Sequence, residues 1–161
     1  MRRKKKNNNK LINTIMIIVI TLLIILLMFL LIKNKGIDNH IVDINYDQYS
    51  EIINKDEYSI ILLTMPTCYH CNVYKPYVNY VCDDYNLKAY NLNINDLEYD
   101  QYMEIHDKYN ATKEKYSENG TPGMSTPTTI IIKNGEEIYS VSGNLGYDGL
   151  LNILKENKVI N

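Results

Sequence analysis

The stretch Met65-Pro66-Thr67-Cys68-Tyr69-His70-Cys71 decides how the rest of the chain is interpreted. Before it, residues 59–63 form a short apolar run rich in β-branched residues, which predicts a strand buried on both faces. After it, residues 72–84 are enough for several helical turns. The two cysteines therefore stand where a strand turns into a helix. The positive dipole end and unpaired N–H groups of a helix start favour a thiolate, the reactive form of cysteine.

The spacing of the two cysteines suits reversible redox chemistry. Two intervening residues let Cys71 reach Cys68 across one helical turn, so the pair can cycle between dithiol and disulfide. Half of a zinc site is the alternative interpretation. Zinc takes four ligands, and the other candidates, Cys82, His40 and His106, have no matching spacing. We therefore expect no bound metal.

The third cysteine and the tyrosines suggest no further chemistry. Cys82 lies eleven residues after Cys71 on the apolar side of the same predicted helix, and we interpret it as a small buried hydrophobe rather than a functional thiol. The six tyrosines from Tyr69 to Tyr90 are interpreted as helix and strand surface. We expect no cofactor.

The charge is distributed unevenly along the 161 residues. The formal net charge of -2 conceals a basic N-terminus, because residues 1–35 carry eight Lys or Arg and no acid. Residues 36–161 carry the other nine bases and all 19 acids. Such an acidic region argues against nucleic acid as a partner, because nucleic-acid affinity depends on neutralising phosphates.

The N-terminal region has the pattern of a membrane anchor. A basic tail at residues 1–10 precedes an apolar run at 15–32 whose one polar residue is Thr21. At about 1.5 Å rise per residue the run is close to the hydrocarbon thickness of a bilayer. We predict a transmembrane anchor at 11–32, a linker at 33–37 and one domain at 38–161. A cleaved signal peptide is the alternative, but its apolar region is shorter and ends in small residues.

The basic residues around the apolar run predict its orientation. Six bases precede the run and two follow it, so the positive-inside rule leaves the N-terminus in the cytoplasm of a single-pass cell-membrane protein. The domain is then extracytoplasmic, where disulfides form and persist. A cleaved signal peptide would export the domain as well.

Periodicity predicts an alternating α and β pattern for the domain. A strand at 41–45 is followed by a helix at 46–56, the strand at 59–63 and the helix that starts at the cysteines. In that helix Val73, Tyr74, Tyr77, Val78 and Val81 recur at helical spacing, and a proline at 76 is expected to kink or interrupt it. Further along we expect a strand at 87–94, a helix at 97–109, a short helix at 111–118, strands at 128–132 and 137–141 joined at Asn134-Gly135, and a helix at 147–157 with Leu150, Leu151 and Leu154 in the core.

This order of elements resembles the thioredoxin fold over about residues 38–157. The motif Cys68-x-x-Cys71 follows the central strand, and Pro76 matches a helix proline eight positions after the first cysteine. Thr126-Pro127-Thr128, followed by a β-branched strand and a hairpin, matches the family's cis-proline, and Gly143 matches its glycine after the last strand. The resemblance implies an α/β fold with a central mixed sheet flanked by helices.

The resemblance also implies roles for individual residues. Cys68 would be the exposed nucleophile that exchanges disulfides with protein thiols, and Cys71 would resolve the mixed disulfide. The backbone of Thr126 beside Pro127 would pair with an extended substrate peptide. His70 would stabilise the Cys68 thiolate, as in oxidases and isomerases of the family, or it is simply exposed. Tyr69 would present an aromatic surface to substrates, or it too is simply exposed.

Three positions depart from the family's pattern. Many thioredoxins place a buried acid where this chain has Leu62, a lysine where it has Asn91, and a tryptophan where it has Thr67. These departures argue against an efficient general reductase. The Pro-Thr-Cys-x-x-Cys form also resembles, on few residues, the thioredoxin-like accessory proteins of bacteriocin export in Gram-positive bacteria.

The sequence therefore favours a bacterial, membrane-anchored thiol-disulfide oxidoreductase that faces outward and acts as an oxidase or isomerase. One alternative is a reductase of exported thiols, which would need a membrane partner to supply electrons. Another is a non-catalytic thioredoxin-fold binding module, such as an accessory subunit of an exporter, whose function would survive loss of both cysteines.

Overall fold

The structure is a computed structural model that describes residues 2–33, 39–113, 120 and 122–161. The chain divides into two units, Met1–Ile37 and Asp38–Asn161. The predicted linker, apart from Lys33, lies outside the described residues.

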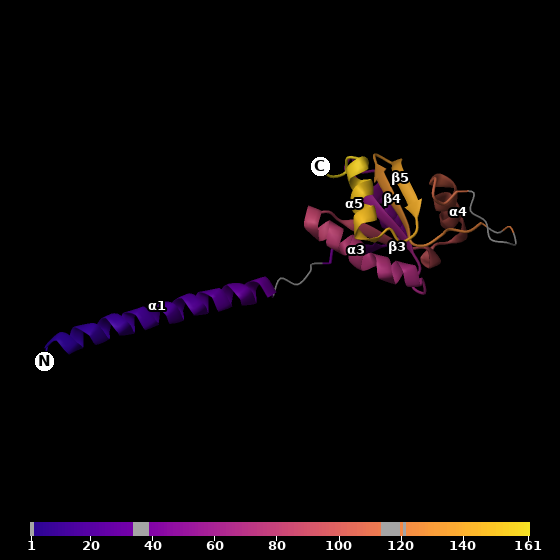
Figure 1. Ribbon diagram of the computed structural model, residues 1–161. Coiled ribbons are helices and arrows are strands. Elements are labelled where there is room, and N and C mark those ends of the chain that lie inside the picture. The colour runs from indigo at the N-terminus through magenta and orange to yellow at the C-terminus, as the bar shows by residue number, and fades with distance from the viewer. Residues whose placement is uncertain (1, 34–38, 114–119, 121) are drawn as a thin grey trace. The chain divides into compact units, whose positions relative to one another are not determined.

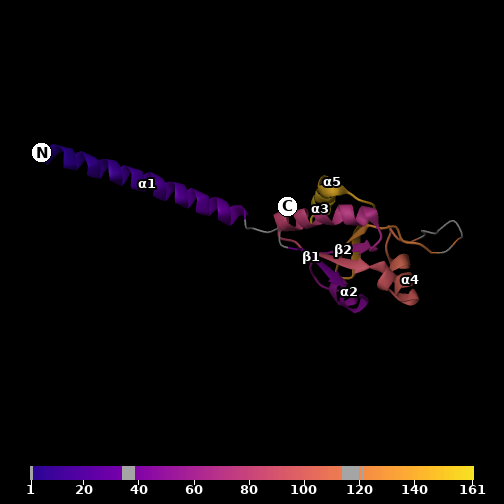
Figure 2. The same ribbon diagram turned by 90° about the horizontal axis from the view of Figure 1, so that it is seen from below.

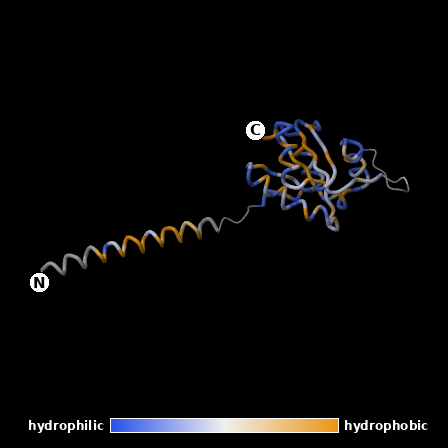
Figure 3. The backbone as a smooth tube through the Cα atoms, viewed as in Figure 1, coloured by the Kyte–Doolittle hydropathy of each residue, from blue (hydrophilic) through white to orange (hydrophobic). Residues whose placement is uncertain are grey.

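The first unit contains one long helix, α1 (Arg2–Lys33). Its segment Leu11–Leu30 has a mean hydropathy of 3.0, and its large apolar side chains are exposed. Figure 3 shows this stretch mostly in orange, with short blue and white interruptions. The hydroxyl of Thr21 donates to the Ile18 carbonyl at 2.8 Å, which satisfies the polar group within the helix. The helix is long and apolar enough to cross a membrane, although a signal sequence meets the same criterion.

The second unit is built on a five-stranded mixed sheet in the order β1-β3-β2-β4-β5. Its strands are β1 (Ile41–Ile44), β2 (Ser59–Thr64), β3 (Ala89–Asn93), β4 (Thr128–Lys133) and β5 (Glu136–Ser142). β3 runs parallel to both β1 and β2, while β4 runs antiparallel to β2 and β5. The sheet is therefore parallel on one side of β2 and antiparallel on the other.

Helices cover both faces of the sheet, as Figures 1 and 2 show. One face carries α2 (Tyr46–Ile53) and α4 (Tyr99–Lys108), the latter preceded by the 3-10 turn η1 (Ile94–Asp96). The other face carries α3 (Tyr69–Tyr85) and α5 (Gly146–Glu156). Two apolar cores result, one on each face.

The central strand β2 contributes to both cores. All six of its residues are buried, as expected for a strand covered on both faces. Ile61 and Leu63 join the core beneath α2 and α4, and Ile60 and Leu62 join the core beneath α3 and α5. This alternation follows the two-residue period of a strand, and it anchors the cysteine loop that follows β2 to the centre of the domain.

The helix α3 differs from expectation in two respects. It continues through Pro76 as one helix, so of the two expected effects of this proline, a kink or an interruption, the interruption does not occur. Tyr74, Val78 and Val81 are buried, but Tyr77 is 40% exposed and does not belong to the apolar face. The helical pattern that includes Tyr74 is confirmed, whereas the interpretation of all six tyrosines as surface was wrong for Tyr74, which packs into the core and pairs its hydroxyl with Thr129 Oγ1 at 3.1 Å.

Other predicted elements differ mainly at their ends. α2 ends at Ile53, because Asn54 forms its C-cap, and β3 begins at Ala89 rather than at residue 87. Residues 111–113 form turns instead of the expected short helix, and residues 114–118 lie outside the described part of the chain. Leu150 and Leu154 of α5 are fully buried, as expected, whereas Leu151 is only partly buried.

The predicted hairpin turn between β4 and β5 is confirmed. Asn134 and Gly135 both adopt positive φ, 53° and 78°, as a two-residue hairpin loop of this type requires. The Gly135 N–H donates to the Ile53 carbonyl at 2.7 Å, which ties the turn to the end of α2.

Candidate functional site

The site is centred on the loop between β2 and α3. Cys68 is the N-cap of α3, and its Sγ accepts a hydrogen bond from the Cys71 backbone N–H at 3.1 Å. The two cysteines form a disulfide, with their Cα atoms 5.3 Å apart. The sulfur of Cys68 thus occupies the position where a helix start stabilises negative charge. This arrangement can hold Cys68 as a thiolate when the pair is reduced.

The two sulfur-bearing residues differ in their access to solvent. Cys71 is fully buried beneath the first turn of α3, whereas Cys68 is only partly buried. An attacking or attacked group from another molecule can therefore reach Cys68 and not Cys71. The two sulfurs therefore differ in accessibility, which is the asymmetry that a two-step disulfide exchange uses.

A loop distant in sequence completes the exposed side of the site. The Thr126–Pro127 peptide bond is cis, and the Thr126 carbonyl oxygen lies 3.5 Å from Cys68 Sγ. The Pro127 carbonyl accepts a hydrogen bond from the Gly143 N–H at 2.7 Å, which holds this loop against the start of the segment after β5. The sequence-predicted residues 68, 126 and 127 are thus brought together by the fold.

The two residues between the cysteines project away from the protein. Tyr69 is 74% exposed, and His70 is exposed as well. Their rings meet edge to face, with centroids 5.6 Å apart. The described interactions of His70 place it against Tyr69 rather than against Cys68. Together the two rings form an exposed aromatic surface in the segment between the two cysteines.

The third cysteine is separate from this site. Cys82 lies near the other end of α3, is fully buried, and packs in the core beneath α3 and α5. Burial raises the pKa of its thiol from 9.0 to about 12, so it stays protonated and unreactive at neutral pH. Among the described residues, no group of three His, Cys, Asp or Glu side chains is close enough to hold a metal ion.

A polar cluster that sequence reasoning did not find lies on three neighbouring strands. Asn91 pairs in register with the fully buried Leu62. The Thr64 hydroxyl, two residues beyond Leu62, donates to Asn91 Oδ1, and Asn91 Nδ2 donates to Asp43 Oδ1. These residues come from β1, β2 and β3, so no local pattern in the sequence joins them.

Solved structures with the same architecture share this arrangement of strands and helices. A putative oxidoreductase with a thioredoxin fold is 18% identical over 70% of this chain and 92% of its own length, with a TM-score of 0.55. Thioredoxin f2 of Chlamydomonas reinhardtii is 11% identical, covers 75% of this chain and 99% of its own, and has a TM-score of 0.59. Spinach chloroplast thioredoxin f is 17% identical over 77% of this chain and 98% of its own, with a TM-score of 0.56.

The chain has a thioredoxin fold. The predicted fold class is confirmed, including the mixed sheet, the helices on both faces and the long apolar helix before the domain. No protein-family model and no curated protein sequence matches the chain.

Proposed function

We propose that this thioredoxin-fold protein is a thiol-disulfide oxidoreductase that exchanges the Cys68–Cys71 disulfide with thiols of exported proteins. The observation that carries the proposal is the asymmetry of the pair, with a partly exposed sulfur at the N-cap of α3 and a fully buried one three residues later. Thioredoxin-fold oxidoreductases among similar structures support the general reaction class.

The reaction divides between the two sulfurs. In the oxidising direction a substrate thiolate attacks Cys68 Sγ, the Cys68–Cys71 bond breaks, and Cys71 leaves as a thiolate that takes up a proton. A second substrate thiolate then attacks the substrate sulfur of this mixed disulfide, releasing oxidised substrate and the Cys68 thiolate. In the reducing direction Cys68 attacks a substrate disulfide, and Cys71 resolves the mixed disulfide by attacking Cys68 Sγ.

Substrate peptides are proposed to bind along the loop at Thr126 and Pro127. The Thr126 carbonyl faces Cys68 Sγ at 3.5 Å, so a peptide strand paired with this backbone would carry its own sulfur to the reactive one. The exposed ring of Tyr69, the residue after Cys68, offers an apolar contact to the same peptide.

We propose the oxidase or isomerase direction, with the reductase as the alternative. The family's buried acid is replaced by Leu62, and His70 lies between the two cysteines, where a ring N–H donor to Cys68 would favour the thiolate and so the reduced form of the protein. A protein with a stabilised reduced form is a better oxidant. A reductase would instead require a membrane partner to supply electrons.

The proposed location is the outer side of the cell membrane. The segment Leu11–Leu30 is long and apolar enough to act as an anchor, and six basic residues precede it. By the positive-inside rule the N-terminus is cytoplasmic and the domain extracytoplasmic, where a disulfide persists. The weaker resemblance to bacteriocin export accessory proteins stays a prediction.

The test is the reduction potential of the pair in the full-length chain held in detergent. A Cys82→Ala variant is equilibrated with glutathione buffers, and its free thiols are trapped and counted. Because Cys82 is absent, the count measures only the reduced fraction of the Cys68–Cys71 pair. A potential of about -120 to -180 mV supports the oxidase or isomerase, and about -270 mV or below supports the reductase. A pair that never forms a disulfide overturns both and leaves a binding module.

A further inference from the structure

The two edges of the five-stranded sheet differ in what lies beside them. Along β5 the Ala111 N–H donates to Ser140 Oγ at 2.8 Å, and the Ala111 carbonyl accepts from Ser142 Oγ at 3.2 Å, so the segment after α4 covers that edge. Along β1, within residues 39–113 and 122–161, β3 is the one strand that pairs with it. The outer edge of β1 is therefore open to another strand.

The backbone of β1 presents hydrogen-bonding groups to this open edge. The His40 carbonyl accepts from the Ala89 N–H at 3.0 Å, and Ile41 is in register with Ala89. The backbone groups of successive strand residues point to opposite edges, so those of Ile41 and Asp43 point away from β3. The Ile41 N–H is satisfied there by Asn39 Oδ1 at 3.1 Å. The Asp43 N–H and the carbonyls of both residues are left for water or for an added strand.

The side chains of β1 divide between the two faces of the sheet. Asp43 is in register with Asn91, and Asn91 with Leu62, which packs in the core beneath α3 and α5. Asp43 and Ile41 therefore lie on the face covered by α3, because residues in register share a face. Val42 points to the opposite face, where its side chain is 41% exposed. The open edge thus carries a carboxylate on one face and an apolar side chain on the other.

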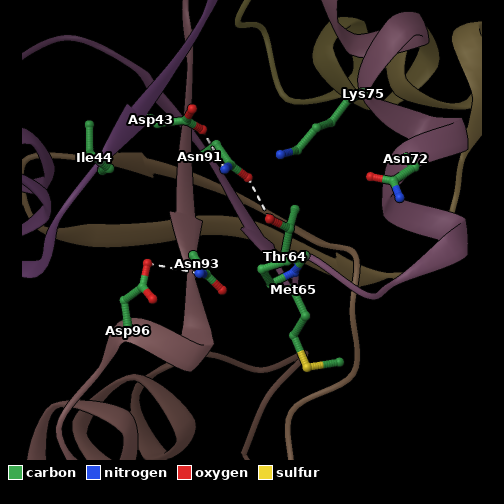
Figure 4. Close-up of a pocket in the computed structure, with 10 residues that line it drawn as sticks. Asp43, Ile44, Thr64, Met65, Asn72, Lys75, Asn91, Asn93 and Asp96 are labelled. Atoms are coloured by element: carbon green, nitrogen blue, oxygen red, sulfur yellow. Dashed lines mark hydrogen bonds between the residues drawn. The ribbon is translucent and has the colours of Figure 1, made fainter.

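A lysine of α3 lies over the same edge. Two cavities of about 350 and 330 Å³ lie between α3 and the β1 side of the sheet, and Asp43, Asn72 and Lys75 line both. Figure 4 shows Lys75 extending from α3 toward Asp43 and Asn91, whose hydrogen bond is drawn as a dashed line. Among the described residues no carboxylate lies within ion-pair distance of Lys75. This face of the open edge therefore offers a positive charge as well as a negative one.

An edge with this pattern is complementary to a second copy of itself. When two β1 strands run antiparallel about a two-fold axis at Val42, each Val42 faces the other as a pair without hydrogen bonds between their backbones. Asp43 then exchanges both backbone hydrogen bonds with Ile41 of the second copy, whose N–H gives up Asn39. The Asp43 carboxylate stands beside that Ile41, which lines the cavity of the second copy's Lys75. Opposite charges therefore meet twice across the axis.

We propose that two copies of this chain pair through their β1 edges, joining their sheets into one, with Asp43 of each copy bound to Lys75 of the other. A contact of four residues on each side is smaller than the roughly 800 Å² per partner of a stable soluble complex. The proposed membrane anchor, on which the strength of this pairing rests, confines the copies to one plane and raises their effective concentration. The dimer is therefore expected in a bilayer.

Cross-linking at the two-fold axis tests the pairing. The full-length chain with its three cysteines replaced (Cys68→Ser, Cys71→Ser, Cys82→Ala) is placed in phospholipid vesicles, and Val42→Cys is added. Side chains facing each other in this way have Cβ atoms about 4.5–5.5 Å apart, close to the spacing of a disulfide. With copper phenanthroline as oxidant, the disulfide-linked dimer is followed by electrophoresis without reductant.

Ile138→Cys is the matched control for this measurement. Ile138 lies on β5 at the other edge of the sheet, and its side chain is 39% exposed, against 41% for Val42. Neither substitution removes a core side chain, and random collisions in the bilayer affect both variants equally. Val42→Cys is expected to cross-link at least about tenfold faster than Ile138→Cys. Equal rates in the two variants overturn the inference.

The charge of Asp43 gives a test of sign. Acids on edge strands commonly prevent pairing, and in that case Asp43→Asn would speed the cross-linking of Val42→Cys. The proposed contact predicts that Asp43→Asn and Lys75→Met each slow it about fivefold, and that the double variant is no slower than either one. A faster or unchanged rate in Asp43→Asn overturns the inference.

Failure of the dimer and failure of the proposed function give different results. Flotation of the vesicles reports the anchor, because a chain that stays in the dense fraction is not held in the bilayer. That result overturns the proposed location, and the Val42→Cys and Ile138→Cys variants are then compared in concentrated solution, where equal rates again overturn the pairing. The reduction potential is measured with Cys68 and Cys71 in place, so the redox proposal is tested separately.

Discussion

The cysteines at the two ends of α3 lie in contrasting environments. At its N-terminal end Cys68 is partly exposed, caps the helix and accepts the Cys71 N–H. Near its C-terminal end Cys82 is fully buried among apolar side chains, and burial raises the pKa of its thiol to about 12. The same residue type on the same helix is thus accessible to other molecules at one end and packed in the core at the other. Position along the helix and access to solvent, rather than the thiol itself, make the difference.

The largest expected contrast is in activity. Cys68→Ser retains a good N-cap but removes the nucleophile, so turnover of a small disulfide substrate by the full-length chain should fall by about 10⁴ or more. Cys82→Ala should stay within about twofold of the parent, because Cys82 does not contact the pair. Comparable losses in both variants would mean that the two ends of α3 are not independent.

Thiol labelling sharpens the same contrast. In the reduced chain at pH 7, iodoacetamide should label Cys68 at least about 10³-fold faster than Cys82, because a thiol with a pKa near 12 is ionised to only about one part in 10⁵. Labelled positions are located by mass spectrometry of peptides. The difference should vanish in concentrated denaturant, where both thiols are exposed; if it persists there, burial is not its cause.

The buried thiol should also make stability fall at alkaline pH. The folded pKa of Cys82 is raised, so its contribution to stability is complete below about pH 9 and is lost as the pH rises toward 12. By pH 11 the loss is roughly 2–3 kcal/mol.

Urea unfolding of the full-length chain between pH 8 and 11 measures this loss. Cys82→Ala should show a shallower decline between pH 9 and 10, before the buried hydroxyls of Tyr74 and Tyr109, whose pKa values are raised to about 12, begin to contribute. If the free energy of unfolding declines equally with pH in the parent and in Cys82→Ala, ionisation of Cys82 is not the cause of the decline.

The smallest effect concerns the C-terminal end of α3. Its C-cap Asn86 adopts a left-handed conformation with φ of 51°, which glycine accepts freely and alanine does not. Asn86→Gly should raise the free energy of unfolding by about 0.5 kcal/mol, and Asn86→Ala should lower it by about 1 kcal/mol. Urea unfolding at pH 7 compares them; an alanine variant as stable as the glycine variant would contradict the assigned cap. Neither change should alter the reactivity of Cys68.

Local patterns predicted most elements because each pattern is a property of neighbouring residues. The run before Thr64 is buried on every side, and Asn134-Gly135 turns the chain as its two positive φ angles require. The errors lie where the local period does not show how far the packed face of a helix extends. Tyr74 and Tyr77 share the helical pattern, but Tyr74 packs in the core beneath α3 and α5, whereas Tyr77, three residues later, remains 40% exposed.

The sequence by itself determined that a Cys68-x-x-Cys71 pair stands between a buried strand and a helix, and that an apolar segment long enough for a membrane precedes the domain. These conclusions follow from short spacings and from periods of two and 3.6 residues, which neighbouring residues encode. Only the tertiary structure decided which sulfur is accessible, that Thr126 faces Cys68 across 58 residues of sequence, and that Asp43, Asn91 and Thr64 form one chain of hydrogen bonds. Such contacts depend on strand order and register, which are set by the packing of the whole domain.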